Sequence, residues 1–109
     1  MQTLVPIGTF ENKARGLLGN DGFEAMLELL ARRPSAGRLI QGSGGLRKIR
    51  IPRPGHGKRG GTRVIYYFHN AQKPILLLLI YAKAKQENLT SGQKTRLKKY
   101  VDQIIEEFG

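Results

Sequence analysis

The chain contains no cysteine, which excludes disulfide bridges, thiolate catalysis and cysteine-bound zinc or iron–sulfur centres. With only two histidines in 109 residues, a histidine-rich metal centre is not expected either. Long apolar segments are also missing: the longest is the six-residue run 75–80, whereas a membrane-spanning helix needs roughly 18–20 residues. Residues 1–10 lack the basic and apolar regions of a secretory signal. We therefore expect a cytoplasmic, soluble protein that forms one domain over residues 1–109.

Acidic residues are scarce and unevenly placed. The chain has 8 Asp and Glu against 19 Lys and Arg, a formal net charge of +11. None of the acids lies between residues 29 and 86, whereas 13 of the 19 bases do, so this window carries +13 and the remainder −2. Such a run can be a solvated face, but 13 like charges repel one another. It favours a polyanionic partner: nucleic acid first, an acidic protein second and an anionic membrane surface third.

The first third of the chain has helical patterning. Residues 2–7 are compatible with a short edge strand that contains Pro6. A helix is predicted over 9–18, with Thr9 as its N-cap and Gly19 as its stop, and a second helix over 22–33, capped by Asn20 or Asp21. The second helix carries an apolar stripe at positions i, i+3, i+4, i+7 and i+8.

The rest of the chain predicts a meander of strands and a closing helix. Residues 46–51, 62–69 and 75–82 have strand patterns, and 38–40 are compatible with an extended segment. Thr90 and Gln93 fit a capping box, and the helix after it has an apolar stripe. The stripe consists of Leu97, Tyr100, Val101, Ile104, Ile105 and Phe108. We expect an α+β fold: N-terminal helices packed on a small, mainly antiparallel, twisted sheet, and a C-terminal helix.

Side-chain alternation assigns the charged residues of the three predicted strands to one of the two faces of the sheet. If Val64, Tyr66 and Phe68 pack under the helices, the opposite face gathers cations and aromatic rings. That face consists of Lys48, Arg50, Arg63, Tyr67, Tyr81 and Lys83. A one-residue bulge would flip half of this set. The composition suits a phosphate backbone with exposed bases.

The glycine-rich connection 55–61 lies at the rim of this predicted surface. It is not a P-loop, because it opens no helix and lacks a Gly-Lys-Ser/Thr triplet. Two interpretations stay open: a flexible connection with basic residues, or a mobile loop that grips nucleic acid. His56, within it, is expected to be exposed rather than catalytic.

Three segments, 44–50, 57–68 and 79–83, resemble the HigB-type branch of the RelE/ParE toxin superfamily. The resemblance implies a RelE-like microbial RNase fold and the toxin half of a type II toxin–antitoxin pair. It also implies an endoribonuclease that cuts messenger RNA in the A site of the 30S subunit on the 70S ribosome, through attack by the 2′-hydroxyl. The implied partners are ribosomal RNA and a HigA-like helix-turn-helix antitoxin, with operator DNA contacted only through that antitoxin. No cofactor, metal or membrane partner is implied.

The resemblance also assigns roles to residues. Lys48 and Arg50 resemble two cationic residues of the family's first meander strand, Arg63 the arginine used against the scissile phosphate, and Lys83 a basic position after the third strand. Some relatives follow that strand with an arginine and then a tyrosine, whereas this chain has Ala84, Lys85 and Gln86. The general acid is therefore left open between Lys83 and Lys85, and the base-stacking ring between Tyr67 and Tyr81. The predicted RNA-binding residues are Arg47, Lys58, Arg59, Tyr67, Tyr81 and Lys85.

The chemistry agrees with these roles in outline. A cluster of cations stabilises the charge of the phosphorane, and a lysine crowded by other cations, such as Lys48, loses its proton more easily and could act as a base. No carboxylate is expected in the cleft to hold a metal. Two alternatives remain: a non-catalytic RNA- or ribosome-binding module, and a co-repressor that acts only with its antitoxin.

Overall fold

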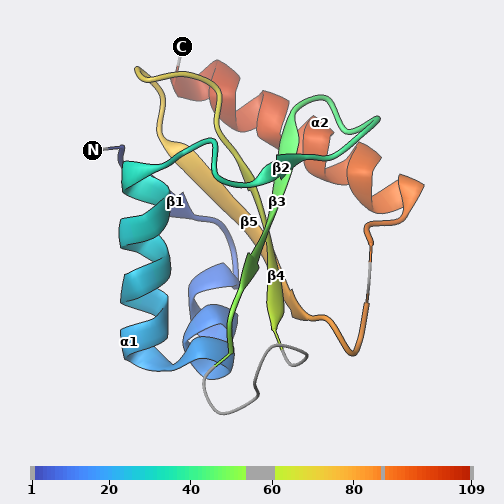
Figure 1. Cartoon of the computed structure of the whole chain (residues 1–109). Helices are drawn as coiled ribbons and strands as arrows, with labels where there is room; N and C mark the ends of the chain where they lie inside the picture. Colours follow the sequence, from blue (N-terminus) through green and yellow to red (C-terminus); the bar gives the residue numbers. More distant parts are fainter. Residues whose placement is uncertain (1, 54–60, 87, 109) are drawn as a thin grey trace.

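A mixed five-stranded sheet separates two helices, which lie on its opposite faces (Figure 1). The computed structural model describes residues 2–53, 61–86 and 88–108. The elements are β1 (Leu4–Pro6), α1 (Phe10–Arg32), β2 (Arg38–Leu39), β3 (Leu46–Ile51), β4 (Thr62–Tyr67), β5 (Ile75–Ala82) and α2 (Ser91–Phe108). The predicted α+β class is confirmed. In the described part of the chain, neither helix is long and apolar enough to cross a membrane.

The strands follow the order β1-β5-β4-β3-β2. Strands β3, β4 and β5 form the predicted antiparallel meander. The short N-terminal strand β1 is an edge, as Pro6 requires, and pairs with β5 in parallel. The extended segment at 38–39 becomes the other edge, β2, antiparallel to β3. Strand β4 is therefore the centre of the sheet.

The face of the sheet under α1, here called the α1 face, holds the main core. Val64 and Tyr66 of β4 are fully buried there against Phe10, Leu18 and other apolar residues of α1. Phe68 is half-buried beside them. The predicted packing of these three residues under the N-terminal helices is confirmed.

The two predicted N-terminal helices form one element with a break at Gly19, whose φ of 74° and ψ of 169° are not helical. Glycine adopts this positive φ without steric cost. Thr9 is the N-cap residue of α1, as predicted, but its side chain makes no capping hydrogen bond. Asn20 does not have a free capping oxygen either, because its Oδ1 accepts a hydrogen bond from Arg15 at 3.0 Å.

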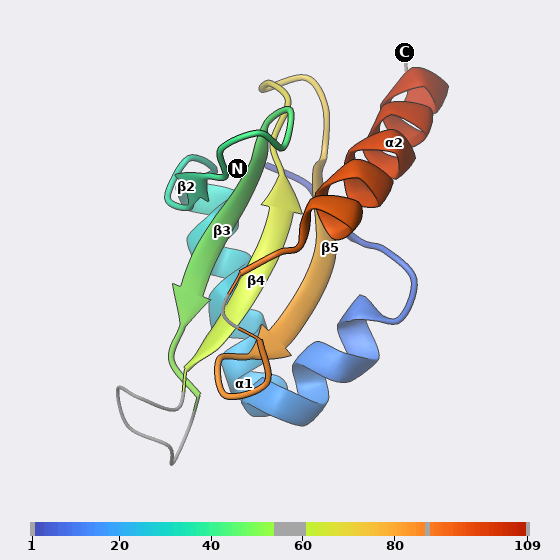
Figure 2. The ribbon, with the colours of Figure 1, turned by 90° about the vertical axis from the view of Figure 1, so that its right-hand side faces the viewer.

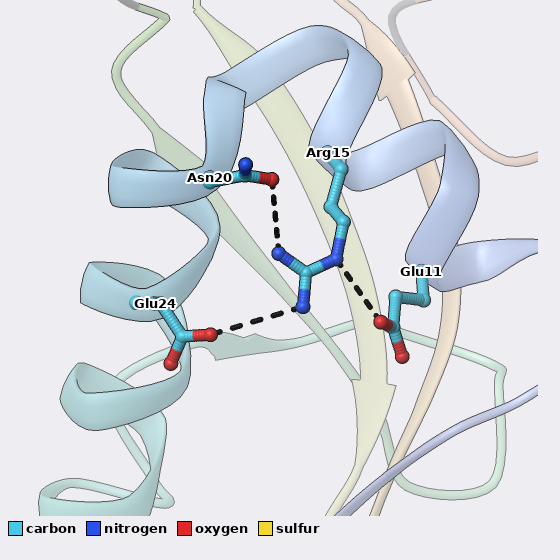
Figure 3. Close-up of polar contacts among 4 residues, drawn as sticks. All are labelled: Glu11, Arg15, Asn20 and Glu24. Carbon is cyan, nitrogen blue, oxygen red and sulfur yellow. Dashed lines mark hydrogen bonds and ion pairs between the residues drawn. The ribbon is translucent and has the colours of Figure 1, made fainter.

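Arg15 ties together the two halves of α1 (Figure 3). Its guanidinium contacts Glu11 before the break at 3.0 Å, Asn20 just after it, and Glu24 at 3.8 Å one turn later. It also lies 4.4 Å from the centre of the Phe23 ring. Exposed ion pairs stabilise a fold by about 0–1 kcal/mol each, so the apolar stripe remains the main restraint on this bend.

The opposite face, here called the α2 face, is covered over only part of its length (Figure 2). The predicted capping box is confirmed: the N–H of Gln93 donates to Thr90 Oγ1 at 3.1 Å, and the N–H of Thr90 donates to Gln93 Oε1 at 2.9 Å. Leu97 and Val101 of α2 then pack with one end of the meander. That end consists of Leu46, Tyr67 and Leu76. Tyr100 is 45% exposed and does not belong to the apolar stripe, contrary to the prediction.

The hydroxyl of buried Tyr66 anchors the segment that leads into β2. It donates to the carbonyl of Pro34 at 2.7 Å and accepts from the N–H of Gly37 at 2.8 Å. A Cβ at Gly37 would lie 2.7 Å from the Tyr66 ring, so only glycine fits this close approach. Burial raises the pKa of Tyr66 above its ordinary value of 10.0, and the Gly37 N–H and the Arg47 charge oppose this shift.

Tyr66→Phe is expected to lower the free energy of unfolding by about 2 kcal/mol at neutral pH, because it leaves the Pro34 and Gly37 backbone groups without their partner. Since the pKa is raised in the folded state, the tyrosine stabilises the fold fully below the unfolded-state pKa, and this contribution falls as pH rises through the folded-state pKa. The difference between wild type and variant should therefore shrink at alkaline pH. Urea unfolding at about pH 8 and about pH 11 measures the difference in free energy of unfolding between wild type and variant. Equal differences at the two pH values would contradict a raised pKa of Tyr66 in the folded state.

Candidate functional site

Arg63 occupies the central strand, directly between two residues of the neighbouring strands. It pairs with Arg50 of β3 on one side and with Tyr81 of β5 on the other. Directly opposed residues of neighbouring strands project from the same face of a sheet. Because Tyr81 packs in the cluster on the α2 face, all three project there. We call Arg50, Arg63 and Tyr81 the basic row; it lies at the end of the meander away from Leu46, Tyr67 and Leu76 (Figure 2).

Arg63 is buried, with 7% of its surface exposed. One of its guanidinium nitrogens lies 3.4 Å from the carbonyl oxygen of Thr62, which is a long hydrogen bond. All ion pairs in the described part of the chain lie on α1 or α2, so no described carboxylate neutralises Arg63. A buried cation without a partner is costly, and an anion that binds it recovers part of that cost. The row therefore fits an anionic ligand.

Gly61 allows the Arg50 side chain to lie close to the start of β4. A Cβ at position 61 would sit 3.2 Å from Arg50 Nε. The carbonyl of Gly61 also accepts the N–H of Lys83 at 3.1 Å, which continues the β4–β5 pairing past the end of β5. Lys83 is thus held directly after the basic row and is half-buried, whereas Lys85 is exposed in the turn that follows.

Lys48 lies on the same face as Arg50, two residues back along β3. Its ammonium donates to Asn88 Oδ1 at 2.9 Å and so points toward the segment that precedes α2. Arg38 of β2 pairs directly with Lys48 and shares its face. Arg38 was missed as a site residue. The sequence predicts that residues 38–40 are extended, but it does not indicate which strand they pair with.

The structure does not bring Tyr67 to the open part of the α2 face. Tyr67 is 8% exposed and lies where α2 crosses the sheet. Its hydroxyl bonds to His69 Nδ1 at 3.1 Å, and the ammonium of Lys98 lies 5.4 Å from its ring centre. Tyr67 therefore lies under α2 and away from Arg63, instead of beside it as predicted. Tyr81 is 9% exposed and is the aromatic residue of the basic row.

A bulge in β5 explains where the predicted alternation fails. The β4–β5 register shifts between Ile65 and Tyr66. Leu77 consequently packs on the α1 face, whereas Leu79 and Tyr81 pack on the α2 face. The three share one parity, so strict alternation without a bulge would place them on one face.

Arg47 is separated from the other predicted site residues. It alternates with Lys48 and projects from the α1 face, where its guanidinium donates to the carbonyls of Gly37 at 2.7 Å and Ser35 at 3.3 Å. It therefore supports β2 rather than the basic row. Lys58 and Arg59, together with His56, lie outside the described residues.

A family model described as "RelE toxin of RelE / RelB toxin-antitoxin system" matches residues 35–107, which include β2 to β5 and nearly all of α2. The chain belongs to the RelE toxin family. It is accordingly a toxin of a toxin–antitoxin system, and it has an antitoxin as a partner. Toxins of the RelE family are endoribonucleases, and the whole basic row lies within the matched region.

Arg50→Ala should weaken the binding of single-stranded RNA to this RelE toxin and change its salt dependence. If Arg50 contacts one phosphate, the slope of log K against log salt should fall by about 0.7. Fluorescence anisotropy with a labelled oligonucleotide over a salt series measures this slope. Arg32→Ala is the matched control, because it removes the same charge from an exposed ion pair on α1. Equal slopes for both variants would show that the salt dependence of RNA binding reports the net charge of the protein and not a phosphate contact at Arg50.

Proposed function

We propose that this RelE toxin is a HigB-type, ribosome-dependent endoribonuclease that cuts translated messenger RNA and so inhibits translation. The observation that carries the proposal is the basic row, in which a buried arginine without a described carboxylate partner lies between Arg50 and Tyr81. Membership of the RelE family supports the reaction class. The messenger would cross the open part of the α2 face, with its scissile phosphate at Arg63.

Cleavage through the 2′-hydroxyl has three requirements: removal of the 2′ proton, stabilisation of the phosphorane, and a proton for the leaving 5′ oxygen. Arg63 and Arg50 would meet the second, since their guanidinium groups are held by the strands before the substrate arrives. Lys48 and Lys83 are the candidate groups for the proton transfers. The ribosome would add the alignment of the 2′-hydroxyl with the phosphate, a contribution that can replace part of the acid–base catalysis.

We propose that this reaction uses no metal ion. The charged side chains described around Arg63 are cations, whereas Mg²⁺ and Ca²⁺ prefer carboxylate and carbonyl oxygens. Cationic side chains would then take the place of a Lewis acid at the phosphate.

The proposed neutralising partner is a HigA-like helix-turn-helix antitoxin. The +13 window between residues 29 and 86 includes Arg38, Lys48, Arg50 and Arg63, and it would attract an acidic protein surface as well as RNA. Operator DNA would be contacted through the antitoxin and not by this chain.

Arg63→Ala is expected to lower the rate of messenger cleavage on programmed ribosomes about 10²–10³-fold, the usual cost of losing one preorganised donor. Arg63→Lys should restore part of the rate, because it keeps the charge but loses the forked geometry. Binding should fall far less than the rate, since Arg63 is one of several phosphate contacts. Primer extension on the bound messenger gives the rate and the cut site, and Arg32→Ala serves as the control with wild-type activity.

A 2′-deoxy nucleotide on the 5′ side of the scissile phosphate should abolish cleavage without abolishing binding, because it removes the attacking hydroxyl. Replacement of one non-bridging oxygen of that phosphate by sulfur should give no rescue by thiophilic metal ions. If wild type and Arg63→Ala bind RNA equally and neither cuts it, the chain is the non-catalytic RNA-binding module instead. Rescue by a thiophilic ion would overturn the metal-free mechanism alone.

A further inference from the structure

A pocket of about 440 Å³ opens between β2 and the first turn of α2, next to the basic row. Its volume is within the range of sites that hold small ligands. Lys48 lines this pocket and also lies two residues from Arg50 on the same face of β3, so the pocket and the basic row adjoin. Apart from Lys48, the residues that line this pocket have no role in the proposed cleavage step.

Three cations from three different elements line the pocket: Arg38 of β2, Lys48 of β3 and Lys94 of α2. No lining residue among those described is acidic, and none of the three cations takes part in a described ion pair. The ammonium groups of Lys48 and Lys94 donate to neutral oxygens, Asn88 Oδ1 at 2.9 Å and the Gln41 carbonyl at 3.1 Å. A phosphate would bind both ammonium groups more strongly than these neutral oxygens do, because its negative charge adds a Coulomb attraction to each hydrogen bond.

The remaining wall of the pocket is partly apolar. Ile40 and Leu89 line it, and both belong to the apolar cluster on the α2 face. A nucleobase that covers the exposed part of this wall removes apolar surface from water, a gain of about 25 cal/mol per Å². The side-chain amide of Asn88 also lines the pocket and can bond to the edge of a base.

We propose that this pocket is a subsite for the RNA nucleotide next to the scissile phosphate. Its phosphate binds Arg38, Lys48 and Lys94, and its base lies against the apolar wall formed by Ile40 and Leu89. This inference rests on the proposed nuclease function. Residues two apart on a strand are separated by about 7 Å and neighbouring strands by about 4.8 Å, so the step from the basic row to the pocket is within reach of an extended RNA strand.

The experiment replaces single phosphate linkages of a ribosome-bound messenger by neutral methylphosphonates, one position at a time on each side of the cut. Wild type, Arg38→Ala, Lys94→Ala and the double variant are compared by kcat/KM, with Arg32→Ala as the control. Arg38 is exposed and Lys94 lies at the surface of the first turn of α2, and thermal unfolding confirms that each variant folds. The scan identifies which phosphate each side chain contacts, whereas loss of activity alone would not.

In wild type, one linkage close to the cut should lower kcat/KM about tenfold when it is neutral, the effect of losing one charge-assisted contact. The double variant should show about the same loss with an unmodified messenger, and no further loss when that linkage is neutral. Arg32→Ala should behave as wild type. The subsite is overturned if wild type cuts the messenger and the double variant either retains full activity or keeps the wild-type response at every linkage. A wild type that does not cut the unmodified messenger overturns the nuclease function, and the subsite with it.

Discussion

The burial of Arg63 in the central strand is the interaction on which the rest of the site depends. With 7% exposure and no described carboxylate beside it, its charge is held in the sheet at the expense of stability. The fold tolerates this because the two faces of the sheet are covered unequally. The α1 face supplies the main core, whereas α2 covers only the end of the meander around Leu46 and Tyr67 (Figure 2). At the other end Arg63 and Tyr81 are nearly buried, and Arg50 is the exposed residue of the basic row by which an anion would reach them.

Side chains on the α1 face hold the backbone segment that leads into β2. Tyr66 and Arg47 both bond to the backbone of Gly37, from which β2 and Arg38 follow directly. Arg38 then pairs with Lys48, which is itself two residues from Arg50. The hydrogen bonds of the α1 face thus position cations on the α2 face.

Local patterns in the sequence were enough to predict the meander, the capping box of α2, the break at Gly19 and the burial of Val64 and Tyr66. They were not enough for long-range docking. The parallel pairing of β1 with β5 and the packing of α2 on β3, β4 and β5 join segments that are far apart in the chain. The pairing of β2 with β3 is local, but its register depends on the glycine-containing turn 40–45 between them. Tyr67 was misplaced because nothing near it in sequence indicates which part of the face α2 covers. A bulge leaves no mark on the pattern either, so strict alternation would put Leu77 on the same face as Tyr81, which the structure does not.

The most direct measurement of the central claim is a map of the backbone amide shifts of this toxin as it binds an RNA that carries a 2′-deoxy nucleotide at the cut site. The account predicts that the shifts concentrate where β3 ends, β4 begins and β5 ends, around Arg50, Arg63 and Lys83, and extend to Arg38 on β2. The amides of α1 around Met26 and Leu30, buried on the opposite face, should not move. Shifts that cluster on α1 and β1, with none at Arg63, would contradict the claim that the open part of the α2 face holds the messenger.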